Sequence, residues 1–290
     1  MASTPRIGVA LGSGGARGIA HIVFIEAMDE MGLAPSLIAG TSIGALIGAG
    51  WASGMSGREL REHATRVLAN VQEIAGRLWT VSHPNLKSII ETGVSVQVDA
   101  ADIVDAYLPE GFPEDFSALR IPFKAVSTDY YRWEQTAFGS GPLRPAIAAS
   151  LAIPGLFRPV RHNGRLMIDG GATNPLPLDH AHEGTDIVVG IDVNGLPTEP
   201  VEPTEPNPID VGFMAAQIMT QSLVRQAMVL HPPDVLVHAP VNGIRILEFW
   251  RVREILALAE AEKDNFKRSL DAAMQSASRR KGSWLGGLFE

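Results

Sequence analysis

The chain has 290 residues, of which 46% are hydrophobic, so it is long enough to bury one large core. Its formal net charge of −8, without a basic stripe along the chain, argues against nucleic acid as a main partner. Because the chain contains no cysteine, disulfides, thiol nucleophiles and thiolate metal sites are excluded.

Short apolar runs alternate along the chain with segments of helical length. The predicted strands are 7–11, 37–39, 123–127, 133–138, 166–168, 187–193 and 235–238, and the predicted helices include 20–31, 45–53, 57–78, 101–108 and 211–230. This alternation predicts an α/β fold with a mostly parallel sheet covered on both faces. The run 133–138 alternates more strongly, which indicates a hairpin or edge strand beside 123–127.

No stretch of the sequence favours a targeting or membrane-spanning segment. The first apolar run, 7–11, is too short and too close to glycines for a secretory signal. The span 33–51 approaches transmembrane length, but it would place Pro35, Ser36, Thr41 and Ser42 in lipid, so a buried strand and helix are favoured. We therefore expect a soluble, cytoplasmic body.

Two connecting segments separate these elements. Residues 85–122 join two predicted strands through helical and proline-containing pieces, a position suited to a cap over a pocket. Residues 196–208 are rich in proline and glutamate, which predicts an exposed, mobile loop before the helix at 211–230. Neither segment indicates a domain boundary, so we expect one domain over 1–278 followed by a tail at 279–290.

A glycine-rich segment, Gly12 to Gly18, lies between the first strand and the first helix. Successive glycines allow backbone N–H groups to face a cavity at a helix N-terminus, where they can bind phosphate or a developing oxyanion. A dinucleotide site would need glycine where Arg17 stands, and a phosphate loop would need Gly-Lys-Ser/Thr, which is absent. A tight turn with no chemical role is the remaining alternative.

The pentapeptide Gly40-Thr41-Ser42-Ile43-Gly44 follows a predicted strand and precedes a predicted helix. This order is typical of a nucleophile elbow, in which Gly40 and Gly44 leave room for a strained turn that presents the serine hydroxyl. An N-cap serine is the structural alternative. Because a glycine-rich segment lies one strand away, Ser42 is a candidate nucleophile with an oxyanion site beside it.

A carboxylate follows a later strand. Asp169-Gly170-Gly171 comes directly after 166–168 and contains the chain's one Asp-Gly pair, which is also a favoured pair in β-turns. A serine hydroxyl needs a base within hydrogen-bond reach, and burial would raise the carboxyl pKa from about 3.9 toward a useful value. Asp169 is therefore the candidate base for Ser42.

Four blocks of the chain together resemble a bacterial member of the patatin-like phospholipase family. They are Gly14-Gly15-Ala16-Arg17-Gly18, the elbow at 40–44, Asp169-Gly170-Gly171 and the segment 148–160, in register over about residues 6–260. The resemblance implies a three-layer α/β/α fold and hydrolysis of lipid esters, as a phospholipase A, lysophospholipase or esterase. It also implies that the hydrolase needs no cofactor and no metal.

The same resemblance implies residue roles. Ser42 would be the nucleophile and Asp169 its base in a dyad, while the backbone N–H groups of Gly14 and Gly15 would form the oxyanion hole. The remaining motif positions would support these groups structurally: Arg17, Gly18, Gly40, Gly44, Gly170 and Gly171. The glycine segment departs from the family pattern in one respect, since Ser13 interrupts the glycine run.

Two other readings remain open. An α/β-hydrolase triad would add a histidine after Asp169, and His238, at the end of a predicted strand, is a better candidate than His180, His182 or His231. His21 fits a helix residue better than a catalyst. Alternatively, the chain is a non-catalytic relative that binds lipid or regulates a partner, although no motif residue is missing.

Two further apolar features suit a lipid substrate. The first is a cluster that could line an acyl pocket beside the elbow, although most such clusters belong to the core: Leu151, Ile153, Pro154, Leu156 and Phe157. The second is the tail at 279–290, which pairs a basic run with Trp284, Leu285, Leu288 and Phe289 and would suit peripheral contact with an anionic membrane. A frayed terminus without a role, or a contact in an oligomer, is the favoured alternative for the tail.

Overall fold

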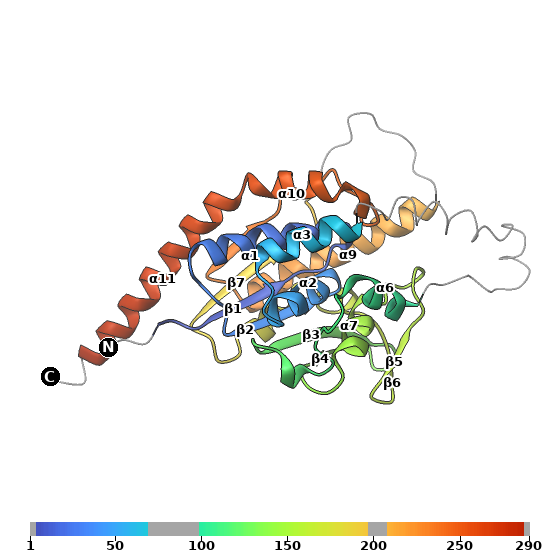
Figure 1. Cartoon of the computed structure of the whole chain (residues 1–290), viewed down its shortest axis with the longest axis horizontal. Coiled ribbons are helices and arrows are strands. Elements are labelled where there is room, and N and C mark those ends of the chain that lie inside the picture. Colours follow the sequence, from blue (N-terminus) through green and yellow to red (C-terminus); the bar gives the residue numbers. More distant parts are fainter. Residues whose placement is uncertain (1–3, 69–98, 197–207, 287–290) are drawn as a thin grey trace, which may run out of the picture.

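The computed structural model describes residues 4–68, 99–196 and 208–286, apart from the side chains at 208–210, 213 and 281–286. Within these residues an eight-stranded sheet forms the centre of the molecule (Figure 1). The strands are β1 Ile7–Leu11, β2 Leu37–Thr41, β3 Phe123–Asp129, β4 Glu134–Phe138, β5 Val160–His162, β6 Arg165–Asp169, β7 Ile187–Asp192 and β8 Val235–His238.

The sheet has a parallel centre and an antiparallel edge. Its order is β5-β6-β3-β2-β1-β7-β8, with β4 paired to β3 outside this path. Strands β3, β2, β1, β7 and β8 run parallel, whereas β4, β5 and β6 pair antiparallel. The prediction of a mostly parallel sheet is confirmed, and 133–138 does form a hairpin with β3. Strand β5 was not predicted.

Helices cover both faces of the sheet. They are α1 His21–Glu30, α2 Ile43–Ala52, α3 Gly57–Leu68, α6 Ala100–Tyr107, α7 Leu143–Leu151, α8 Leu178–Ala181, α9 Pro208–Leu230, α10 Val252–Glu260 and α11 Lys263–Gly286. The short 3-10 turns are η1 Gly15–Ala20, η2 Phe116–Ala118, η3 Gly170–Ala172 and η4 Phe249–Arg251. The predicted helix at 57–78 is described only as far as Leu68.

Two hydrophobic cores identify the layers. The larger core joins the side chains of Ile7, Val9 and Leu11 to α1, α2, α7, α10 and α11. The smaller core joins Ala10, which points the opposite way along β1, to α8 and α9. Because successive residues of one strand enter different cores, the sheet is the middle layer of a three-layer α/β/α structure.

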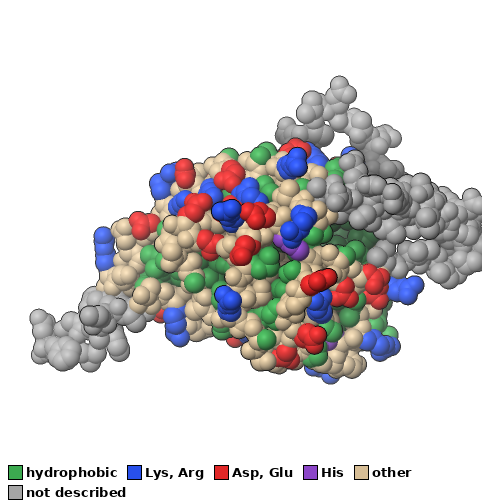
Figure 2. All heavy atoms as spheres, viewed as in Figure 1, with side chains coloured by type: hydrophobic (Ala, Val, Ile, Leu, Met, Phe, Trp, Pro, Cys, Tyr) green, Lys and Arg blue, Asp and Glu red, His purple; other side chains and the backbone are tan. Residues whose placement is uncertain are grey.

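The outer surface carries charges of both signs. Figure 2 shows acidic and basic side chains interspersed on one face rather than gathered in a stripe of one sign. Ion pairs join neighbouring helices: Arg61 of α3 contacts Glu26 of α1 at 2.5 Å, and Lys263 of α11 contacts Glu30 at 2.7 Å. Within the described ranges, the helices are all too short or too polar to cross a bilayer.

Besides the end of the helix predicted at 57–78, three predicted segments fall wholly or partly outside the described residues. They are 85–98 of the proposed cap region, the Pro/Glu stretch at 197–207 and the end of the tail at 287–290. The position at which the sequence separates a domain from a tail, between 278 and 279, lies inside α11.

Candidate active site

Strand β3 brings the elbow and the Asp-Gly-Gly motif together. Val126 pairs with Thr41 at the end of β2, and the next residue, Ser127, pairs with Asp169 at the end of β6. Strand β4 occupies the other edge of β3 along the same residues. Strands β2 and β6 therefore meet end to end along one edge of β3, and Ser42 emerges beside Asp169.

The turn at Ser42 has the geometry of a strained elbow. Ser42 adopts φ 57° and ψ −123°, a conformation that few non-glycine residues occupy. A Cβ at Gly40 would collide with the carbonyl of Gly44, and a Cβ at Gly44 would collide with the carbonyl of Leu11. The sequence expectation that glycine is required at both positions is consistent with these close approaches.

A serine of α7 holds the elbow in place. The hydroxyl of Ser150 accepts the N–H of Ser42 at 2.8 Å and donates to the carbonyl of Val126 at 2.6 Å. Thr128 holds the backbone of Asp169 in a similar way, since its hydroxyl donates to the carbonyl of Asp169 at 3.0 Å. Sequence reasoning gave neither residue a role, although Ser150 lies in the segment 148–160 that carries the family resemblance.

Ser42 and Asp169 are in direct contact. The hydroxyl of Ser42 donates to Oδ2 of Asp169 at 2.5 Å, and the N–H of Gly171 donates to Oδ1 at 2.7 Å. Both side chains are buried, with residue exposures of 2% and 6%. Burial raises the pKa of Asp169 to about 6, although both hydrogen bonds act to lower it. The sequence led us to expect an exposed serine hydroxyl, and this was wrong, because Ser42 is buried against Asp169.

The glycine-rich segment leaves two adjacent amides unpaired. The N–H groups of Gly12, Ser13 and Ala16 all donate to backbone carbonyls. Those of Gly14 and Gly15 find no acceptor among the described residues. Gly15 has φ +58°, so the chain enters the left-handed region directly after these two amides. Unpaired, neighbouring N–H groups at the start of a helical turn are suited to bind an anion or an oxyanion.

The supporting motif positions make close backbone contacts. A Cβ at Gly18 would collide with Ile43 of α2, and a Cβ at Gly170 would collide with the carbonyl of Val126. The guanidinium of the half-buried Arg17 donates to the carbonyl of Ile244 at 2.7 Å and to that of Asn194. These residues pack the three motifs against one another.

The histidine candidates lie elsewhere. Nδ1 of His238 contacts Oδ2 of Asp192 at 2.9 Å. Strand β8 is separated from β2 by β1 and β7, so three strand spacings, about 14 Å, lie between His238 and the elbow. His21 contacts the carbonyl of Gly12 through Nε2. In the described part of the chain no histidine forms a hydrogen bond with Ser42 or Asp169.

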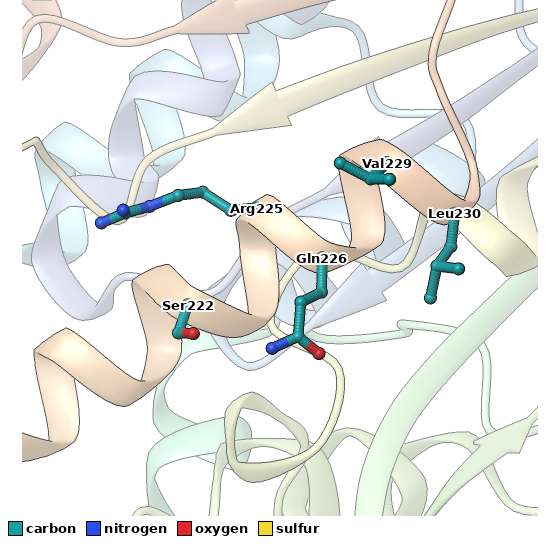
Figure 3. Close-up of a pocket in the computed structure, with 5 residues that line it drawn as sticks. All are labelled: Ser222, Arg225, Gln226, Val229 and Leu230. Atoms are coloured by element: carbon teal, nitrogen blue, oxygen red, sulfur yellow. The ribbon is translucent and has the colours of Figure 1, made fainter.

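The apolar cluster after α7 is only partly buried. Leu151 is buried and Phe157 packs against the larger core, whereas Pro154 is exposed. Two pockets lie away from the dyad. One of 420 Å³ follows the last turns of α9, where Ser222, Arg225, Gln226, Val229 and Leu230 line it (Figure 3). The other, of 510 Å³, lies between α6, α7 and β5.

Comparisons with known proteins identify the family and the fold. The model of the family described as patatin-like phospholipase matches residues 9–182. A Mycobacterium tuberculosis protein described as an uncharacterised NTE family protein is 38% identical over 206 residues, which cover 71% of this chain and 54% of that protein. A lysophospholipase of Pyricularia oryzae is 28% identical over 287 residues, which cover 86% of this chain and 18% of that protein.

A solved structure shares the fold. The crystal structure of VipD from Legionella pneumophila superimposes with a TM-score of 0.51 at 15% sequence identity, covering 92% of this chain and 67% of that one. The chain spans about half the length of its mycobacterial relative, 54%, and much less of the fungal one, 18%.

Proposed function

The chain belongs to the patatin-like phospholipase family, and from this membership we propose that it is a serine hydrolase that cleaves carboxylic ester bonds of lipids. The observation that carries the proposal is the hydrogen bond of 2.5 Å between Oγ of Ser42 and Oδ2 of Asp169. A hydroxyl in this position can lose its proton to the carboxylate as it attacks an ester.

In the proposed reaction, Oγ of Ser42 attacks the ester carbonyl carbon while its proton passes to Asp169. The carbonyl π electrons move to oxygen, and the resulting oxyanion accepts the unpaired N–H groups of Gly14 and Gly15. Each such donor contributes roughly 2.7–4 kcal/mol to stabilising this intermediate. As the intermediate collapses, the bond to the leaving alcohol breaks, and Asp169 returns the proton to the alcohol oxygen.

The resulting acyl-enzyme is then released by water. Asp169, again ionised, takes a proton from a water molecule that attacks the acyl carbonyl, and the second oxyanion is held by the same amides. Collapse returns the proton to Oγ of Ser42 and frees the carboxylic acid. The nucleophile, the base and the oxyanion donors of both steps all belong to this chain, and the water comes from solvent.

A serine-reactive fluorophosphonate probe tests the enzyme class. We expect wild type to be labelled and Ser42→Ala to be unlabelled, because the variant lacks the attacking oxygen. Asp169→Asn should label at least about 100-fold more slowly, since the general base is lost. His238→Ala is the matched control for a triad, and it should label at the wild-type rate. Absence of labelling in wild type would instead favour a non-catalytic relative.

We propose phospholipase A or lysophospholipase activity as the natural role. The family and the named lysophospholipase relative support a lipid ester as substrate. A series of nitrophenyl esters of increasing chain length, followed by phospholipids and their lyso forms, tests this role. Equal turnover of acetate and long-chain esters, without turnover of any phospholipid, would contradict it.

A further inference from the structure

One residue outside the motifs contacts the glycine-rich segment on both sides of its unpaired amides. Oδ1 of Asn194, in the loop after β7, accepts the hydroxyl of Ser13 at 3.1 Å. The backbone carbonyl of Asn194 accepts a guanidinium N–H of Arg17. Gly14 and Gly15 therefore lie between two contacts that Asn194 makes.

A buried carboxylate fixes the orientation of Asn194. Its backbone N–H and its Nδ2 both donate to Oδ1 of Asp192, at 2.9 and 3.1 Å. An amide that gives its NH₂ group to a carboxylate must turn its oxygen the other way, toward Ser13. Asp192 and Asn194 are 2% and 3% exposed, so water competes little for these bonds.

The backbone of the glycine-rich segment lies directly on the same loop. A Cβ at Gly14 would be 2.7 Å from the carbonyl oxygen of Val193, between Asp192 and Asn194. On its other side the network reaches the dyad, since a Cβ at Gly171 would lie 3.3 Å from Oγ of Ser13 and 3.0 Å from Oδ1 of Asp169. A shift of this loop is therefore transmitted to the amides of the proposed oxyanion hole.

We propose that Asn194 is a positioning residue for ester hydrolysis, which, oriented by Asp192, holds Ser13 and Arg17 and so fixes the N–H groups of Gly14 and Gly15 where the oxyanion forms. This inference rests on the proposed function. It places part of the catalytic geometry in the loop after β7, beyond the end of the segment that the family model matches, at residue 182.

The test separates positioning from simple support of the fold. Asn194→Ala removes the amide, and Ser13→Ala removes only the hydroxyl that meets it. In each variant we expect kcat on a soluble nitrophenyl ester to fall about 10- to 100-fold, with KM changed less than about twofold, because the amides act in the transition state. The Ki of a trifluoromethyl ketone, which forms a tetrahedral oxyanion on the serine, should rise by the same factor as kcat falls.

The double variant gives a second criterion. Because Asn194 acts through its hydrogen bond to Ser13, combining Ser13→Ala with Asn194→Ala should lower kcat no further than Asn194→Ala alone. Asn242→Ala is the matched control: it removes a bond of 2.8 Å from the N–H of Leu196 in the same loop, without a contact to the glycine-rich segment. Its kcat and Ki should equal those of wild type.

Several outcomes would overturn the inference. Wild-type kcat in folded Asn194→Ala and Ser13→Ala would do so, as would an equal loss in Asn242→Ala, which would indicate general loosening of the loop. If Asn194→Ala does not fold, Ser13→Ala decides, since it loses one hydroxyl alone. A wild-type chain that does not label with the fluorophosphonate would overturn the proposed function as well, whereas normal labelling with unchanged kcat in the variants would overturn only the role of Asn194.

Discussion

Asp169 is the residue whose surroundings bear most directly on reactivity. A carboxylate with an ordinary pKa would be a weak base, whereas burial raises the pKa of Asp169 to about 6. The hydrogen bonds from Ser42 and Gly171 keep the ionised form accessible near neutral pH. The proposed base is therefore matched to work at about pH 6 and above.

We expect the pH dependence of kcat/KM to report this pKa. Asp169 must be ionised to accept the proton, so the rate should fall about tenfold per pH unit below about pH 6 and be level above it. Initial rates on a soluble ester between pH 4.5 and 8.5 provide the measurement, with enzyme stability checked at each pH. A kcat/KM that begins to fall only near pH 4, the ordinary pKa of an aspartate, would contradict the prediction.

Asp169→Asn should stabilise the protein while removing its activity. The folded-state pKa of about 6 lies above the unfolded value of 3.8. Ionised Asp169 therefore destabilises the fold above pH 6, by about 3 kcal/mol, because each unit of difference between the two pKa values costs about 1.4 kcal/mol. The gain from the substitution should be present at pH 8, shrink as the pH falls through 6 and vanish near 4. Urea unfolding at pH 8 and pH 4.5 measures it, and a variant less stable than wild type at pH 8 would refute the argument.

At the scale of elements, local patterns predicted the motifs but not the contacts that support them. The elbow and the Asp-Gly-Gly motif were visible because glycine spacing is a local property. The roles of Ser150 and Asn194 were not, because Ser42 and Ser13, which they contact, lie more than 100 residues away in the sequence. Strand β5 was missed because it is three residues long and contains an arginine and a histidine.

The start of α2 provides an element-scale prediction. A Cβ at Gly44 would lie 2.8 Å from the carbonyl oxygen of Gly12, besides colliding with Leu11. Gly44→Ala should therefore push the elbow and the glycine-rich segment apart, costing about 1–3 kcal/mol of stability and most of the activity. Gly212→Ala is the matched control, because a Cβ there, in α9, meets nothing within 4 Å. It should leave activity unchanged and add up to about 1 kcal/mol of stability; equal losses in both variants would contradict the prediction.

At the scale of the whole molecule, the family model accounts for the first part of the chain, while α9, α10 and α11 lie beyond residue 182. These helices complete the layers, since α9 belongs to the smaller core and α10 and α11 to the larger one. The three-layer architecture could be predicted from the alternation of strands and helices and from the family resemblance. The end-to-end meeting of β2 and β6 could not, because strand register depends on distant pairings.

Membrane contact by the tail at 279–290 remains a proposal with its own test. Deleting these residues leaves Ala277, which is buried, in place at the end of the packed part of α11. We expect the deletion to weaken binding to anionic vesicles while hydrolysis of a soluble ester is unchanged, because the basic and aromatic residues are lost. Sedimentation with vesicles measures the effect, and unaltered vesicle binding would count against a role for the tail.

The pairing of β3 with both β2 and β6 has a consequence for how the protein matures. The two side chains of the proposed dyad are 127 positions apart and meet only after β6 has aligned on β3, a long-range closure that folding chains reach slowly. A ribosome-bound or truncated product that ends before residue 165 would contain the whole elbow yet be chemically inert. Regain of esterase activity after dilution from denaturant would therefore time the closing of the sheet, and it should lag behind the recovery of helical signal.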